Sequence, residues 1–211
     1  MAGAGRVIAG SARGTRLAAP GPGTRPLADR AKEVLFAILE PDLAGAAVLD
    51  CCAGSGAAGI EALSRGAARA VLVERDERAC RTIAVNLART GLAGRALVAR
   101  AEVLGYLAGR AAADGPFDIA VVDPPHAEAG LRRRLVEALG EAAAALRPGA
   151  RVVVSGPWRD PPPPTAGLLR SERERRVGET VLTFYRRLAP GAPAEPEPGQ
   201  GARRSVAAEG R

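Results

Sequence analysis

The feature that most constrains the fold is a serial alternation of short apolar runs and helix-length segments between residues 47 and 155. The apolar runs are predicted as strands over Ala47–Cys51, Ala70–Glu74, Ala96–Arg100, Ile119–Asp123 and Arg151–Ser155. The segments between them are predicted as helices over Ala57–Arg65, Glu77–Thr90, Val103–Ala113 and Ala127–Leu146. Such βα units in series favour a parallel sheet with helices on both faces. Ligands of these sheets bind beyond the carboxyl ends of the strands.

The flanking segments have other patterns. Apolar side chains at helical spacing predict a helix over Asp29–Leu39, which Pro41 and Gly45 are expected to end. A short strand is compatible with Arg6–Gly10, and the β segments Leu168–Arg173 and Thr180–Arg187 predict an antiparallel addition to the sheet edge. We expect a basic N-terminal arm or hairpin over residues 1–24, an α/β domain over 25–188 and a disordered tail over 189–211.

Composition limits the classes of function. The net charge of +7 favours a polyanionic partner, although genome composition or a solvated, flexible N-terminus explains the same charge equally well. No apolar run approaches the roughly 20 residues that cross a bilayer, so we expect a cytoplasmic protein. We also expect it to be a monomer. The single histidine and the absence of a CxxC pair predict no metal. Arginine suits the phosphates of such a partner, and the candidate contacts are Arg6, Arg13, Arg16, Arg25 and Arg30.

The tetrapeptide Asp123-Pro124-Pro125-His126 follows the fourth predicted strand. Neither proline has a backbone N–H, and each fixes its own φ, so the chain there is stiff. The Asp123 carboxylate and the Pro124 carbonyl could both accept hydrogen bonds from one –NH2 group, while the His126 ring stacks on the plane that carries it. Alternatively, His126 is a surface residue that caps the following helix. The tetrapeptide predicts a site for a planar aromatic amine.

The first βα turn, residues 50–59, is the predicted cofactor loop. Gly54 and Gly56 allow a tight turn and close approach to a ligand, and Gly59 allows close helix packing. The spacing also fits a dinucleotide pattern. Asp50 at the strand end favours S-adenosylmethionine instead, because a carboxylate attracts the cationic amino group of a methionine moiety and repels a pyrophosphate.

Two further carboxylates follow the next strands. Glu74 is suited to accept from ribose hydroxyls, and Glu102 from an adenine amine, although both could be solvated loop residues. The predicted cofactor contacts are Asp50, Ala53, Gly54, Ser55, Gly56, Glu74, Arg75, Glu102, Val103 and Asp123.

These motifs together resemble the class I methyltransferases that act on amino groups of bases. Further segments resemble the bacterial RsmD-type 16S rRNA guanine-N2-methyltransferases: Arg25-Pro26, Asp29-Arg30, Glu33, Leu35-Phe36, the run from Ala53-Gly54-Ser55-Gly56 through Glu61 to Ala67, and Gly178-Glu179-Thr180 to Tyr185-Arg186. The resemblance covers about residues 6–187. His126 departs from the Tyr or Phe usual in that family, and Cys52 lies where a bulkier ring is common.

The resemblance implies a Rossmann-like fold, with a mainly parallel seven-stranded sheet, a C-terminal antiparallel strand and helices on both faces. It implies methyl transfer from S-adenosylmethionine to the N2 amine of a guanine in 16S rRNA or a small-subunit assembly intermediate, with Asp123 and the Pro124 carbonyl orienting the amine. Three alternatives stay open: another planar amine (adenine N6 in DNA or RNA, or a protein glutamine), a non-catalytic RNA-binding assembly factor, and a dinucleotide oxidoreductase. The last leaves the tetrapeptide unexplained.

Overall fold

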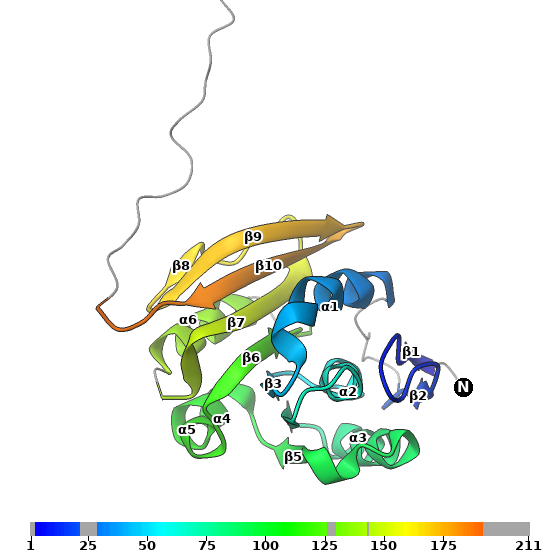
Figure 1. The fold of residues 1–211 in the computed structure, drawn as a ribbon. Coiled ribbons are helices and arrows are strands. Elements are labelled where there is room, and N and C mark those ends of the chain that lie inside the picture. The colour runs from blue at the N-terminus through cyan, green and yellow to red at the C-terminus, as the bar shows by residue number, and fades with distance from the viewer. Residues whose placement is uncertain (1–2, 22–28, 126–129, 143, 192–211) are drawn as a thin grey trace, which may run out of the picture.

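The fold is organised around an eight-stranded sheet in the order β5-β4-β3-β6-β7-β10-β9-β8 (Figure 1). The structure is a computed structural model that describes residues 3–21, 29–125, 130–142 and 144–191. The strands are β3 Ala47–Asp50, β4 Arg69–Glu74, β5 Ala96–Arg100, β6 Phe117–Val122, β7 Leu146–Pro157, β8 Thr165–Ala166, β9 Leu169–Val177 and β10 Thr180–Arg187. Strands β3 to β7 are parallel to their neighbours in that group. Strand β10 then pairs antiparallel with β7, and β9 pairs antiparallel with β10.

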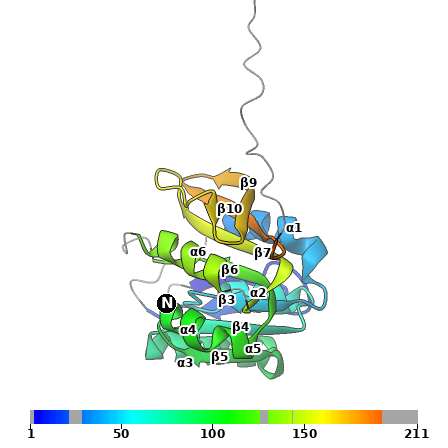
Figure 2. The ribbon, with the colours of Figure 1, turned by 90° about the vertical axis from the view of Figure 1, so that its left-hand side faces the viewer.

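Helices cover both faces of this sheet, which makes three layers (Figure 2). One face carries α1 Asp29–Leu43, α2 Ala57–Ser64 and α3 Glu77–Thr90, and the other carries α4 Val103–Gly109, α5 Ala111–Asp114 and α6 Leu131–Glu141. A short 3-10 turn, η1 Ala93–Arg95, precedes β5. Strand β3 is buried on both sides, with Val48 in the core under α1 to α3 and Leu49 in the core under α4 to α6. This burial explains its continuous apolar sequence.

A small antiparallel hairpin lies outside the main sheet, beside α2 and α3 (Figure 1). It consists of β1 Gly3–Arg6 and β2 Arg16–Ala18. Residues 7–10, which were compatible with a strand in the sequence, form the loop that follows β1 instead. The Ile8 and Ala9 N–H groups in this loop donate to the Glu61 side chain on α2 rather than to a neighbouring strand.

The predicted α/β fold with a mainly parallel sheet and helices on both faces is confirmed. The seven expected strands correspond to β3 to β7, β9 and β10, and the eighth is the two-residue β8. The predicted disordered tail from residue 192 onward lies outside the described residues. Among the helices of the described residues, none has the length and apolar character that a membrane crossing requires.

The largest differences from the predicted helices concern α1, the segment of α4 and α5, and α6. Helix α1 continues through Pro41 to Leu43, because Leu43 packs into the core and the proline lies in the last turn. The segment predicted as a single helix over residues 103–113 is split into α4 and α5 at Arg110. Helix α6 ends at Glu141, since Leu146 already belongs to β7, the strand that pairs with β6.

Candidate functional site

Asp123 lies one residue beyond the carboxyl end of β6, at the edge where ligands of such sheets bind. Its side chain is half-buried, Pro124 is buried and Pro125 is exposed. The hydroxyl of Ser155 donates a close hydrogen bond to Asp123 Oδ1. Strands β6 and β7 are parallel, and Val122 pairs with Val154. The residues that follow, Asp123 and Ser155, are therefore neighbours. The neighbouring strand thus holds the carboxylate in place.

Ser155 was predicted only as the end of a strand and not as a member of this site. A serine at a strand end carries little signal by itself, and only the register between β6 and β7 identifies its partner. His126, the fourth residue of the tetrapeptide, lies outside the described residues. Its predicted stacking role stays a prediction.

The predicted cofactor loop joins β3 to α2 and lies between the ends of two other strands. The Cys51 N–H donates to the carbonyl of Val121 in β6 at 2.9 Å, and the Ala53 N–H donates to the carbonyl of Val73 in β4 at 3.0 Å. Gly56 has a φ of +80°, in the left-handed region that favours glycine. A Cβ on Gly59 would lie 2.8 Å from Leu72 Cδ2, which confirms that this glycine allows α2 to pack closely on the sheet.

Both predicted carboxylates of the loop accept backbone hydrogen bonds. Asp50 Oδ2 accepts from the N–H of Gly59 in the first turn of α2, at 2.9 Å. Glu74 Oε2 accepts from the N–H of Gly54 at 2.8 Å, and its Oε1 accepts from the N–H of Asp76 at 2.9 Å. Asp50 therefore fixes the start of α2, and Glu74 fixes the glycine turn. Each carboxylate oxygen has two lone pairs, so these bonds leave acceptor capacity for a ligand.

Asp50, Glu74 and Asp123 make this edge of the sheet acidic. Asp50 is only 2% exposed, and its burial raises the pKa of the carboxyl from 3.8 to about 7. The charges of Asp123 and Glu74 raise the pKa as well, against hydrogen bonds from backbone groups that lower it. A cationic group bound here would offset the cost of ionising Asp50. The site therefore suits a positively charged ligand better than a pyrophosphate.

The remaining predicted cofactor residues lie at the ends of β4 and β5. Arg75 and Glu102 are both exposed and form an ion pair, with Arg75 Nη1 3.3 Å from Glu102 Oε1. Val103 is buried as the first residue of α4. The structure thus brings the ends of β3, β4, β5 and β6 to one edge, as predicted. Within the described residues, no three His, Cys, Asp or Glu side chains group closely enough to hold a metal ion.

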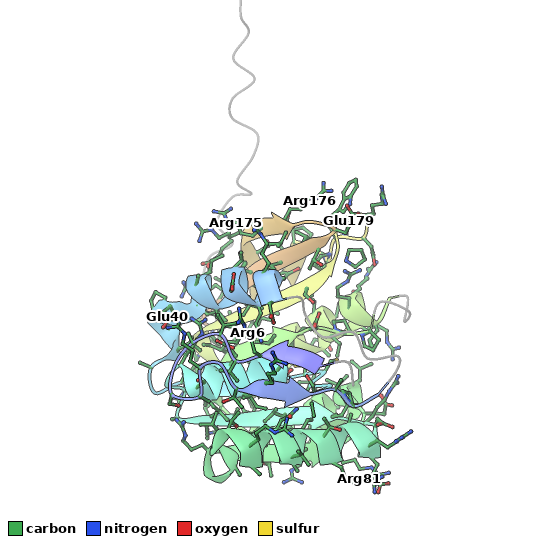
Figure 3. The ribbon with its side chains drawn as sticks, turned by 90° about the vertical axis from the view of Figure 1, so that its right-hand side faces the viewer. Arg6, Glu40, Arg81, Arg175, Arg176 and Glu179 are labelled. Atoms are coloured by element: carbon green, nitrogen blue, oxygen red, sulfur yellow. The ribbon has the colours of Figure 1, made fainter. Side chains whose placement is uncertain are left out.

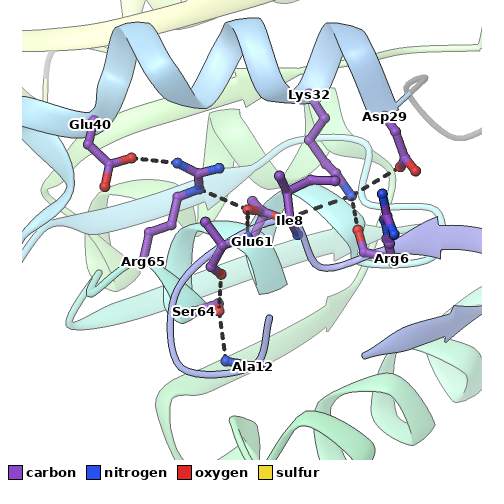
Figure 4. A network of polar contacts seen from close by, with 10 residues as sticks. Arg6, Ile8, Ala12, Asp29, Lys32, Glu40, Glu61, Ser64 and Arg65 are labelled. Atoms are coloured by element: carbon purple, nitrogen blue, oxygen red, sulfur yellow. Dashed lines mark hydrogen bonds and ion pairs between the residues drawn. The ribbon is translucent and has the colours of Figure 1, made fainter. Parts of the chain in front are cut away.

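Glu61 attaches the N-terminal segment to α2 (Figure 4). Its side chain is fully buried, with Oε2 accepting from the Ile8 N–H at 2.8 Å and Oε1 from the Ala9 N–H at 3.0 Å. One turn later in α2, Ser64 Oγ accepts from the Ala12 N–H at 3.0 Å and donates to the Ala9 carbonyl at 2.6 Å. The loop between β1 and β2 is therefore fixed to the domain through its backbone.

Two cations balance the buried charge of Glu61 (Figure 4). Lys32 Nζ lies 3.8 Å from Glu61 Oε2 and donates to the Arg6 carbonyl at 2.5 Å. On the other side, Arg65 Nε donates to Glu61 Oε1 at 2.8 Å. Lys32 is 1% exposed. Lys32 is one of the basic residues near the N-terminus, but its buried side chain stabilises the fold and does not bind a partner at the surface.

Asn86 connects the same hairpin to the cofactor loop. This fully buried side chain on α3 accepts from the Ala18 N–H at 2.8 Å and donates to the Ala18 carbonyl at 3.0 Å, which pairs it with β2. Its amide also donates to the Ser55 carbonyl at 2.9 Å. Sequence reasoning missed this residue. The only signal was a polar side chain on the apolar face of an amphipathic helix.

The comparisons with known proteins agree with this geometry. A family model described as "Conserved hypothetical protein 95" matches residues 5–186. The chain is 38% identical over 190 residues to "Ribosomal RNA small subunit methyltransferase D" of Escherichia coli, covering 88% of this chain and 91% of that protein. The chain belongs to the RsmD family of methyltransferases.

Solved structures support the RsmD fold. The Escherichia coli protein yhhF superimposes with a TM-score of 0.77 at 35% identity, over 87% of this chain and 98% of that one. An RNA methyltransferase from Salinibacter ruber, solved in complex with S-adenosyl-L-homocysteine, has a TM-score of 0.59 at 15% identity over 77% of this chain and 94% of that one. The second likeness concerns the fold alone.

The basic residues predicted to contact RNA lie mostly on the hairpin of this RsmD-family chain. Arg6, Arg13 and Arg16 are exposed on or beside β1 and β2, and Arg30 is exposed at the start of α1. Figure 3 shows Arg6 on the face where the hairpin lies. Arg25 falls outside the described residues. The hairpin thus presents cations on a support that Glu61, Ser64 and Asn86 hold to the domain.

Proposed function

We propose that this protein transfers a methyl group from S-adenosylmethionine to the exocyclic N2 amine of a guanine in small-subunit ribosomal RNA. The observation that carries the proposal is the Asp123 carboxylate, which follows β6, precedes two prolines and is held by the Ser155 hydroxyl. The substrate is 16S rRNA or a small-subunit assembly intermediate, and the enzyme acts as a cytoplasmic monomer. The name of the Escherichia coli relative supports the choice of ribosomal RNA.

The residues of the cofactor loop fit S-adenosylmethionine. When bound, this cofactor supplies a methyl group that the positive charge on its sulfur makes electrophilic. Asp50 would hold the cationic amino group of the methionine moiety, and Glu74 would hold the ribose hydroxyls. The glycine turn at Gly54 and Gly56 leaves room for the ligand beside the backbone, and Glu102 would receive the adenine amine. The buried Asp50, with its raised pKa, supports this assignment because a cation stabilises its ionised form.

The tetrapeptide would orient the nucleophile. The N2 amine of guanine is a weak nucleophile, because its lone pair is delocalised into the ring. Asp123 and the Pro124 carbonyl accept hydrogen bonds from the –NH2 group and stabilise the positive charge that develops on the nitrogen. Asp123 need not remove a proton before the attack. Ser155 limits the rotation of the carboxylate, and a target base that is paired or stacked must first be everted into the pocket.

The exposed arginines of the hairpin would bind phosphates of the same RNA. Arg6, Arg13 and Arg16 lie on the hairpin, which α2 and α3 hold through Glu61 and Asn86, and Arg30 lies at the start of α1. An RNA strand bound to the hairpin is therefore positioned relative to the cofactor loop. Phosphate contacts of this kind give affinity and orientation, while the tetrapeptide gives the choice of base. Asn86 joins the hairpin directly to the cofactor loop, because its side chain bonds to Ala18 and to Ser55.

A competition among acceptors tests the proposal. Labelled S-adenosylmethionine is offered with unmodified small ribosomal subunits, duplex DNA and a glutamine-containing protein in one reaction, and the label in each acceptor is counted. We expect label in the ribosomal RNA only. Label in DNA adenine or in protein would replace the assignment with another planar amine. Cofactor binding without transfer to any acceptor would support a non-catalytic assembly factor.

A further inference from the structure

Trp158, the single tryptophan of the chain, is exposed at the same edge of the sheet as Asp123. Strand β7 runs parallel to β6, so the strand that supplies Ser155 to Asp123 continues to Pro157 and then to Trp158. Trp158 follows Ser155 by three positions, a rise of about 10 Å along an extended chain. The turn between β9 and β10 meets the tryptophan there, because the Trp158 N–H donates to the Glu179 carbonyl at 3.2 Å.

Two guanidinium groups lie over the indole ring. The Cζ atoms of Arg159 and Arg176 are 4.7 Å and 4.3 Å from the ring centroid. Glu179 orients the ring, since the indole Nε1 donates to its Oε2 at 3.0 Å. Figure 3 shows Arg176 and Glu179 at this end of the molecule. We call Trp158, Arg159 and Arg176 the Trp158 stack.

Side-chain contacts from α6 and β10 hold the loop that carries Trp158 and Arg159. Arg132 on α6, 8% exposed, forms a close ion pair with Asp160, and it packs so tightly that a Cβ on Gly156 would meet its Nη1 at 1.3 Å. Further along, the Tyr185 hydroxyl donates to the Pro163 carbonyl at 2.7 Å within a run of four prolines. The stack therefore rests on a stiff support, which reduces the entropy lost when it binds a partner.

We propose that the Trp158 stack binds the RNA strand next to the target guanine, by stacking on an unpaired base and attracting its phosphate. This inference rests on the proposed function. Aromatic rings and arginine planes are the groups on which proteins stack unpaired RNA bases. The stack lies beyond β7, about 10 Å along the chain from the Ser155 that holds Asp123, a distance that a short single-stranded segment spans. The two cations complement the charge of the RNA backbone.

Substitutions in the Trp158 stack test the proposal through the kinetics of methyl transfer. Initial rates are measured against the concentration of unmodified small ribosomal subunits for Trp158→Ala, Arg176→Ala and Arg176→Lys. Loss of a stacked base lowers kcat/KM by about 5- to 150-fold for Trp158→Ala. Arg176→Lys keeps the charge but loses the planar group, so it should fall between the wild type and Arg176→Ala.

Arg175→Ala is the matched control. Arg175 precedes Arg176 on β9, so its side chain lies on the opposite face of the strand. Each arginine donates one hydrogen bond to a backbone carbonyl, Arg175 to that of Glu174 and Arg176 to that of Gly178, both at 2.9 Å. Arg176 Nη2 also lies 3.6 Å from Glu179 Oε1. This variant loses the same charge and should retain kcat/KM. Equilibrium dialysis should give wild-type affinity for S-adenosylmethionine in all four variants, and circular dichroism should show the same fold.

The outcomes separate this inference from the proposed function. If the wild type methylates the subunits and the Trp158 and Arg176 variants match Arg175→Ala, the Trp158 stack has no part in RNA binding and the inference is wrong. If the wild type transfers no methyl group to RNA, the proposed function is wrong, and so is the inference that rests on it. In an active wild type, the fluorescence of Trp158 should also change on RNA binding and stay constant with S-adenosylmethionine alone.

Discussion

Replacing Asp50 with asparagine should stabilise the cofactor-free protein above pH 7. Asp50 is 2% exposed, and its pKa rises to about 7 mainly because burial removes water from the charged form. A rise from 3.8 corresponds to about 4 kcal/mol, since each pKa unit is worth about 1.4 kcal/mol. Asparagine can still accept from the Gly59 N–H, but it has one acceptor oxygen instead of two, which costs about 1 kcal/mol. We expect a net gain of about 3 kcal/mol near pH 8.

The pH dependence identifies the cause. Between pH 3.8 and about 7, the folded wild type keeps a proton on Asp50 that the unfolded chain has lost. The contribution of Asp50 to the free energy of unfolding therefore falls as pH rises through this window, by up to about 1.4 kcal/mol per pH unit, and is constant above it. The variant lacks this group. The stability difference between the two proteins should widen up to about pH 7 and then stay constant.

Urea unfolding followed by circular dichroism measures this difference. With an m-value of about 2 kcal/mol/M, the midpoint of Asp50→Asn should exceed that of the wild type by about 1.5 M near pH 8. Asp42→Asn, at an exposed position in α1, is the matched control and should show no widening gap. The same Asp50 variant should bind S-adenosylmethionine more weakly. A stability difference that does not change between about pH 5 and about pH 8 would refute the reasoning.

Three further perturbations follow from the contacts of the site. Asp123→Ala should nearly abolish methyl transfer while the dissociation constant for S-adenosylmethionine stays within about threefold of the wild type; equal losses in both would place Asp123 in the cofactor site. Glu61→Gln leaves a buried lysine less well paired and should lower the free energy of unfolding by about 3 kcal/mol, measured by urea unfolding; an unchanged midpoint would contradict the role of this cluster. The double variant Arg13→Ala, Arg16→Ala should bind RNA more weakly and with a smaller dependence of affinity on salt concentration, measured by filter binding. An unchanged salt dependence would mean that neither arginine contacts the RNA.

The acidic edge of the sheet was predictable because its determinants are local. Asp50, Glu74 and Asp123 each follow an apolar run with strand-like length, and parallel topology brings the carboxyl ends of such runs to one edge. The glycines of the first turn are also a local signal, since Gly56 has the left-handed φ that its type favours. These patterns were sufficient to predict the core fold and the position of the three carboxylates at one edge of the sheet, while their roles toward a ligand stay predictions.

Side chains that act across the fold were not predictable in this way. Ser155 meets Asp123 only through the register of β6 and β7, and Asn86 meets Ala18 across 68 positions of sequence. Glu61 carried part of the family resemblance, but nothing local shows that it would bind the backbone of the hairpin. The predicted end of α1 was wrong for a similar reason. The burial of Leu43 outweighs the local preference of proline to end a helix.

Mapping the transferred methyl group tests the central claim most directly. Unmodified small ribosomal subunits are incubated with labelled S-adenosylmethionine and the wild-type protein, and the ribosomal RNA is digested to nucleosides. We predict that the label appears as N2-methylguanosine at a single position of 16S rRNA, and that Asp123→Ala under the same conditions leaves that position unlabelled. Label on any other atom or base, or an active Asp123→Ala, would contradict the account of this site.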